Sequence, residues 1–223
     1  MIYLRLKLLL CFLLLCTSII LINISAEEKT KYILIDPGHG GMDPGSNIGN
    51  IKESDIVLEI SFKIAEVLES FGYNVVLTRE NKESLCEGEF IKKEDTEKRI
   101  NTINSHNTII VISIHLNEFG LSEYRGGQVF YNDNNPANKL LANHIQKSLK
   151  MYLKNTDRSI IKKENNYLLK RITCPACIVE CGFMSNDQEL SLLLDEKYQY
   201  RLAMSILYGI NSYLSEKNIN NNY

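Results

Sequence analysis

The amino-acid sequence predicts an α/β protein, a single-domain sandwich with a largely parallel central sheet flanked by helices. Short apolar runs of strand length alternate along the chain with longer segments whose apolar residues recur at helical spacing. A chain of 223 residues with 44% hydrophobic composition is also long enough to bury one ordinary core. Strands that alternate with helices in this way are typical of a sheet whose strands run mostly parallel.

Five strands are predicted from apolar runs bounded by turn residues. The first, over residues 32–35, ends at Asp-Pro-Gly, and the strongest is the run Thr-Ile-Ile-Val-Ile-Ser-Ile over residues 108–114. The remaining strands are predicted over residues 74–78, 126–131 and 176–180.

Helices are predicted between these strands. In residues 54–71 the apolar side chains fall on one helical face, and Gly72 provides a stop. Pro136 suits the first turn of a helix over residues 136–153. The other predicted helices span residues 96–105, 186–194 and 198–214, while the charge-dense segment 80–94 and the polar segment 155–166 are predicted to be loops.

The two ends of the chain differ from this domain, which is predicted to span residues 31–215. Arg5 and Lys7 precede a long apolar run, and the small residue Ala26 follows it, a pattern typical of an export signal over residues 1–26. An uncleaved membrane anchor through residues 8–24 is the alternative, although the apolar run is short beside the roughly 20 residues of a typical span. The tail over residues 216–223 is predicted to be disordered.

The charge distribution excludes one class of partner. The formal net charge is −2, and the lysines are scattered among glutamates without a basic stripe. The electrostatic footprint of a nucleic-acid-binding protein is therefore missing.

Four residues in short, distinctive segments are candidates for metal binding and catalysis. His39, Glu53, His115 and Glu180 lie in Asp-Pro-Gly-His-Gly-Gly, Ile-Lys-Glu-Ser-Asp, Ser-Ile-His-Leu-Asn and Val-Glu-Cys-Gly-Phe. Two imidazoles and a carboxylate can bind a catalytic zinc ion, and a further acidic group can take a proton from water. Three of the four follow or end predicted strands, where ligands bind in open α/β sheets.

Each of these residues also has a purely structural interpretation. Glu53 could be a carboxylate placed near the positive end of a helix dipole, and His115 a histidine satisfied by a backbone carbonyl. Glu180 interrupts an apolar run, and a buried carboxylate is costly unless it is paired. His106 and His144 lie in polar or helical contexts and are predicted to be surface residues.

The glycine-rich loop around His39 and the cysteines near Glu180 admit other functions. No Lys-Ser/Thr pair follows the glycines, so the phosphate-binding loop motif is absent. Cys174 and Cys177 form a C-x-x-C pair that could be redox-active, while buried thiols that behave as small hydrophobic groups are the alternative for these two residues and for Cys181.

Taken together, the four segments resemble the zinc-dependent N-acetylmuramoyl-L-alanine amidases of the third amidase group, with a match that runs from about Tyr32 to Leu214. The segments Gly-Gly-Gln-Val-Phe-Tyr at 126–131 and Tyr-Leu-Leu-Lys at 167–170 are most similar to the germination-specific amidases of the spore cortex. The chain departs from the family where Ser54 replaces the usual lysine and where cysteines surround the catalytic glutamate.

This resemblance implies a function for each residue. His39, Glu53 and His115 would bind one zinc ion per chain, and Glu180 would be the catalytic acid and base. Apart from the resemblance, Asn117, in the same segment as His115, is a further candidate for substrate binding. The substrate would be the amide between N-acetylmuramic acid and L-alanine in peptidoglycan, outside the cytoplasmic membrane in the cell wall or spore cortex. An accessory protein is possible. The alternatives are a peptidoglycan-binding module without activity and a thiol-redox protein.

Overall fold

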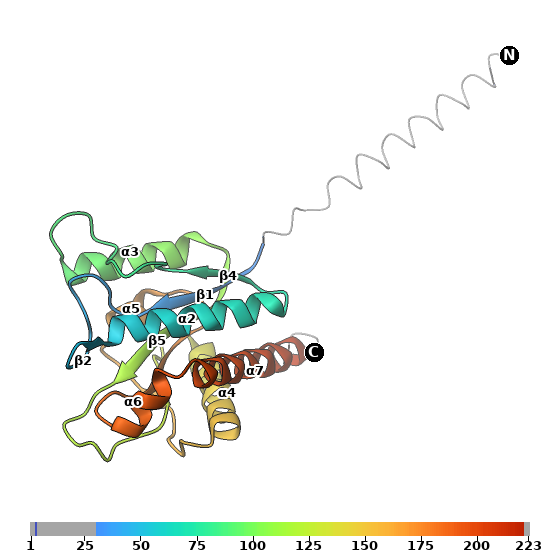
Figure 1. Cartoon of the computed structure of the whole chain (residues 1–223). Helices are drawn as coiled ribbons and strands as arrows, with labels where there is room; N and C mark the ends of the chain where they lie inside the picture. The colour runs from blue at the N-terminus through green and yellow to red at the C-terminus, as the bar shows by residue number, and fades with distance from the viewer. Residues whose placement is uncertain (1–2, 4–29, 221–223) are drawn as a thin grey trace. The chain divides into compact units, whose positions relative to one another are not determined.

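The computed structural model describes residue 3 and residues 30–220 (Figure 1). The predicted export signal over residues 1–26 and the possible anchor over residues 8–24 therefore fall almost wholly outside the described residues. Within the part of the chain that the structure describes, no helix is both long enough and apolar enough to cross a membrane.

A six-stranded sheet forms the centre of the unit that begins at Lys31. Its strands lie in the order β4-β1-β5-β8-β6-β7 and span Asn74–Leu77, Tyr32–Pro37, Thr108–Asn117, Ala176–Phe183, Gln128–Tyr131 and Ile161–Lys162. All neighbouring strands are parallel except β6 and β8, which are antiparallel. The predicted fold class is confirmed.

Two helical layers cover the sheet. The larger core cluster joins the sheet to α2 (Glu53–Ser70), α4 (Pro136–Leu153), α6 (Asp187–Leu193) and α7 (Glu196–Asn220). The smaller cluster joins the opposite face to α3 (Lys92–Ser105) and α5 (Tyr167–Arg171). In Figure 1, α3 lies on one side of the strands, while α4 and α7 pack together on the other.

The strand register brings the candidate catalytic and metal-binding residues together at one end of the strands. Pro37 at the end of β1 pairs with Ile114 of β5, and His115 pairs with Glu180 of β8. The loop that carries His39 therefore begins beside the residue that precedes His115. The parallel arrangement places three segments that are distant in sequence at the carboxyl ends of adjacent strands.

Several predicted boundaries are wrong. The segment 80–94 is predicted to be a loop, but α3 begins at Lys92, and the ion pair of Asp95 and Arg99, one turn apart, stabilises its first turns. The segment 155–166 contains the short strand β7. The short helix α5, which begins where the Asn166 side chain accepts from the Leu169 N–H, was not predicted. Nor was the small hairpin of β2 (Asn47–Ile48) and β3 (Ile51–Lys52).

The prediction of a disordered tail from residue 216 is wrong for its first five residues. Helix α7 continues to Asn220, and His144 of α4 contacts both Ser212 and Glu216 of this helix, at 2.8 and 2.9 Å. These contacts tie the end of the helix to the domain. Residues 221–223 lie outside the described residues.

Candidate metal centre and active site

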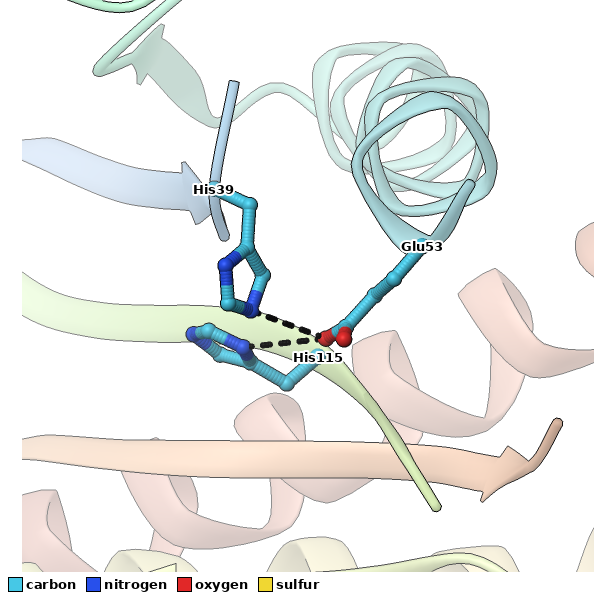
Figure 2. A group of neighbouring side chains, drawn as sticks. All are labelled: His39, Glu53 and His115. Carbon is cyan, nitrogen blue, oxygen red and sulfur yellow. Dashed lines mark hydrogen bonds and ion pairs between the residues drawn. The ribbon is translucent and has the colours of Figure 1, made fainter. Parts of the chain in front are cut away.

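His39, Glu53 and His115 form one compact group. His39 Nε2 and His115 Nδ1 each lie 3.2 Å from Glu53 Oε1. Figure 2 shows the two imidazole rings pointing at the same carboxylate from the loop after β1 and from β5, while Glu53 extends from the start of α2. One ligand atom from each residue lies within 4.8 Å of the others. The sequence-predicted ligands therefore meet in space.

Glu53 is held rigidly in this group. It is the first residue of α2 and is only 3% exposed. Its Oε1 accepts from the Leu116 N–H at 2.9 Å, and its Oε2 accepts from the Ser46 N–H at 2.9 Å. Burial would raise the pKa of Glu53, but hydrogen bonds from the two imidazoles hold that pKa well below its ordinary value. The carboxylate is thus ionised and available to a cation.

The loop that carries His39 takes a conformation that few side chains adopt. His39 has a φ of 58°, in the left-handed region, and the glycines on either side of it leave room for close approach. A Cβ on Gly38 would lie 2.4 Å from the His115 ring. The glycine is therefore required for the two imidazoles to approach each other.

Two buried arginines hold the loop that carries His39 in place. The Arg79 guanidinium donates to the carbonyl oxygens of Gly38 and Ser54, each at 2.8 Å. The Arg99 guanidinium donates to the carbonyls of Pro37 and His39. Arg79 therefore ties the His39 loop to the first turn of α2, where Glu53 lies. The sequence interpretation missed both residues, although Arg99, one turn after Asp95 on the same helix, offered a signal of a buried ion pair.

Asp36 completes this buried network. It is 1% exposed, and it accepts from Thr78 Oγ1 at 2.6 Å, from Ser113 Oγ at 2.7 Å and from Arg99 Nη1 at 2.9 Å. Burial would raise its pKa, but the Arg99 charge and the two hydroxyl groups hold the pKa below its ordinary value. Asp36 of β1 thus joins Ser113 of β5 to Thr78, which directly follows β4.

We expect Asp36→Asn to lower the free energy of unfolding by about 3 kcal/mol. This is the lower end of the range for breaking a buried ion pair, because Asp95 still neutralises Arg99 at 2.7 Å. Since the folded state holds the Asp36 pKa below 3.8, wild-type stability from this group is present above that pH and is lost as the pH falls through the lowered pKa. Urea unfolding at pH 7 and at pH 3 measures both effects.

The control for this variant is Asp55→Asn, whose carboxylate pairs with Lys82 at the surface. A change within about 0.5 kcal/mol is expected there. A similarly small change in Asp36→Asn would show that the buried network contributes little to stability.

Glu180 lies beside the group without belonging to it. It is 9% exposed on β8, where its neighbours in the register are His115 and Gln128. Its Oε2 is buried and has no hydrogen-bond partner. Burial raises the pKa of Glu180 above its ordinary value, and the nearby His115 opposes that shift. A buried carboxylate without a partner is costly, so structure alone does not account for this residue.

A cleft of about 530 Å³ opens over these side chains. Its lining includes His39, Glu53, His115, Asn117, Lys163 and Glu180. Asn117 ends β5, and its carbonyl oxygen accepts from the Met184 N–H at 2.8 Å. The structure therefore places every predicted site residue around one cavity. Lys163 was missed, because nothing in the sequence shows that the side chain after β7 reaches this cleft.

The remaining histidines lie outside the group. His106 Nδ1 contacts the Thr102 carbonyl oxygen at 2.7 Å, and His144 contacts residues of α7. Both are half-buried, so the prediction that they are surface residues is only partly correct.

Cys174 and Cys177 do not form a redox pair in this structure. Cys177 and Cys181 are fully buried in the larger core cluster, whereas Cys174 packs against the cluster on the opposite face of the sheet. All three are free thiols. Burial raises the pKa of Cys174 to about 11, and it raises that of Cys177 further. Thiols with such pKa values are poor nucleophiles at neutral pH, in agreement with the buried-thiol interpretation.

The donor set suits a zinc ion. Ligand atoms at about 2.0–2.2 Å from a tetrahedral zinc lie roughly 3.3 Å apart, and the two nitrogen-to-oxygen distances here are both 3.2 Å. Burial would lower the pKa of His39, yet the carboxylates of Glu53 and Asp43 raise it above its ordinary value. The site thus attracts positive charge, which a divalent cation can supply.

Known proteins resemble this chain in sequence. Residues 33–212 match the profile of a family described as N-acetylmuramoyl-L-alanine amidase. The germination-specific N-acetylmuramoyl-L-alanine amidase of Bacillus subtilis is 38% identical over 192 residues, which cover 84% of this chain and 81% of that protein. The N-acetylmuramoyl-L-alanine amidase LytC of the same species is 30% identical over 187 residues, 81% of this chain and 35% of LytC.

A solved structure agrees with the sequence relatives. The CwlD amidase from Clostridioides difficile, determined in complex with the GerS lipoprotein, has a TM-score of 0.78 and 38% sequence identity to this chain. The match covers 83% of this chain and 99% of that one. Because the family profile spans most of the sequence and the fold agrees, this chain belongs to the N-acetylmuramoyl-L-alanine amidase family.

Proposed function

We propose that this protein is a zinc-dependent hydrolase that cleaves the amide between N-acetylmuramic acid and L-alanine in peptidoglycan. The observation that carries the proposal is the convergence of His39, Glu53 and His115 beside the unpartnered carboxylate of Glu180 in one cleft. A catalytic zinc site needs three protein ligands and an open position, and a neighbouring acid or base for proton transfer.

In this mechanism His39, Glu53 and His115 would hold the zinc ion. When bound, zinc lowers the pKa of a water molecule and polarises a carbonyl oxygen. Glu180 accepts a proton from the attacking water and donates it to the nitrogen of the leaving amine. Its burial supports this role, since a carboxyl group whose pKa is raised holds and returns a proton more readily near neutral pH. Asn117 also lines the cleft and would contact the substrate.

We place the activity outside the cytoplasmic membrane, on spore-cortex peptidoglycan. The pattern over residues 1–26 and the similarity to a germination-specific amidase support this assignment. The related CwlD amidase forms a complex with a lipoprotein, which supports an accessory protein here as well. Cell fractionation that found the full-length protein in the cytoplasm would contradict the location.

The alternative of a binding module without catalysis is disfavoured by the site itself. All four chemical residues lie at the cleft, and the buried Glu180 carboxylate has no partner that a purely structural role would provide.

The direct test is mass spectrometry of purified peptidoglycan incubated with the zinc-loaded protein. We expect release of intact stem peptides with a new L-alanine amino terminus, and no release after treatment with a chelator. Parallel digests of cortex and vegetative peptidoglycan show which wall is the substrate. Glycan fragments without free stem peptides would disprove amidase activity, and equal cleavage of both walls would disprove a cortex-specific role.

A further inference from the structure

The cations that line the cleft differ in their partners. Lys92 lies 3.1 Å from Asp43 Oδ2, so a carboxylate of the protein already neutralises it. Lys163 also lines the cleft, together with Glu180 and Asn117. Within residues 30–220, no carboxylate lies at ion-pair distance from Lys163. Its ammonium group lies instead over the Phe130 ring, 5.1 Å from the centroid. Lys163 is therefore a cation at the cleft that forms no ion pair within the described residues.

The backbone of Lys163 is fixed although its side chain is exposed. Lys163 directly follows β7, and its N–H donates to the Tyr131 carbonyl oxygen at 2.7 Å. Its own carbonyl oxygen accepts from Asn132 Nδ2 at 2.9 Å. These bonds and the Phe130 ring restrict where the ammonium group can lie, which reduces the entropy lost when it binds an anion.

The neighbouring lysine shows the opposite arrangement. Lys162 lies 2.6 Å from Asp133 and 3.0 Å from Glu164, so its charge is already paired, and it does not line the cleft. Two adjacent lysines of similar exposure thus differ in whether a carboxylate of the protein neutralises them. Lys162 provides a matched control for Lys163.

We propose that Lys163 binds a carboxylate of the stem peptide and so makes the enzyme prefer anionic peptides. The inference rests on the proposed function. Stem peptides carry free carboxylates beyond the L-alanine residue, and some of these can be converted to carboxamides. The same cleft is lined by the group of His39, Glu53 and His115 and by Lys163, so a peptide with its scissile amide at the group would have a carboxylate within the cleft for Lys163 to bind. A charge-assisted hydrogen bond provides the discrimination.

The test compares two muramoyl peptides that differ only in whether the carboxylates of the stem are free or amidated. With the zinc-loaded protein, we expect Lys163→Met to raise KM for the free-carboxylate substrate about tenfold, the effect of losing one charge-assisted hydrogen bond. The kcat and the KM for the amidated substrate should stay within about twofold of wild type. Lys163→Arg should keep the preference, and Lys162→Met should behave as wild type.

Two results would overturn the inference. One is an unchanged KM of Lys163→Met for the free-carboxylate substrate. The other is an equal fall in kcat on both substrates, which would show that the Lys163 charge acts on Glu180. Burial raises the pKa of Glu180, and the charge of this lysine opposes that rise. If wild type hydrolyses neither substrate, the proposed function fails. Calorimetric titration with the free and the amidated stem peptides then tests Lys163 separately, and equal affinities of wild type for both would refute its role.

Discussion

Glu180→Gln is expected to lower turnover by about 10²–10⁴-fold, the usual contribution of general acid–base catalysis. Glutamine has nearly the same size as glutamate and fits the same buried position on β8, but it cannot accept a proton from water. Zinc content should stay near wild type, because Glu180 lies outside the group formed by His39, Glu53 and His115. The melting temperature should also change little, since Glu180 Oε2 has no partner to lose.

Glu189→Gln is the matched control for this variant. Glu189 is 5% exposed, and its carboxylate accepts from the backbone N–H groups of Gly126 and Phe183, each at 2.9 Å. Its replacement should lower stability while leaving turnover per folded molecule nearly unchanged. Zinc content, melting temperature and stem-peptide release are measured on one preparation of each protein. Near-normal turnover of Glu180→Gln would refute its catalytic role.

His39→Ala and His115→Ala are each expected to lose both zinc and activity. Removing one imidazole leaves two protein ligands, which is too few for a three-ligand catalytic site. It also removes one of the two ring nitrogens that lie 3.2 Å from Glu53 Oε1. Elemental analysis should find one zinc per chain in wild type and nearly none in either variant.

His144→Ala controls for the general loss of a histidine. His144 contacts Ser212 and Glu216 on α7, away from the group. This variant should keep one zinc per chain and full activity. Full zinc occupancy in His39→Ala or His115→Ala would contradict the ligand assignment.

The local sequence pattern predicted most of the fold, because the strands and long helices are apolar with clear periodicity. It failed where a short element depends on a distant partner. Strand β7 is only two residues long and exists through its pairing with β6, and Arg99 of α3 is held by Asp36 of β1, which lies 63 residues earlier in the chain. Neither partnership can be read from a window of neighbouring residues.

The same limit separates the parts of the site that could be predicted from those that could not. The proposed ligands lie in distinctive segments, so their residue types alone indicated metal chemistry. Arg79 and Lys163 act through position, one by holding the carbonyls of Gly38 and Ser54 and the other by lining the cleft. Their importance appears only when the folded chain brings the segments that follow β4 and β7 to the site.

The distance in sequence between Glu53 and His115, which are 62 residues apart, has a practical consequence for handling the protein. A metal ion held between them would bind the folded chain far better than the unfolded one, and each tenfold rise of free metal above the dissociation constant adds about 1.4 kcal/mol to stability. Purification on chelating resin, or storage with a chelator, would remove the metal and therefore lower the free energy of unfolding. Preparations depleted of metal would be recognised by aggregation and proteolysis as well as by low activity.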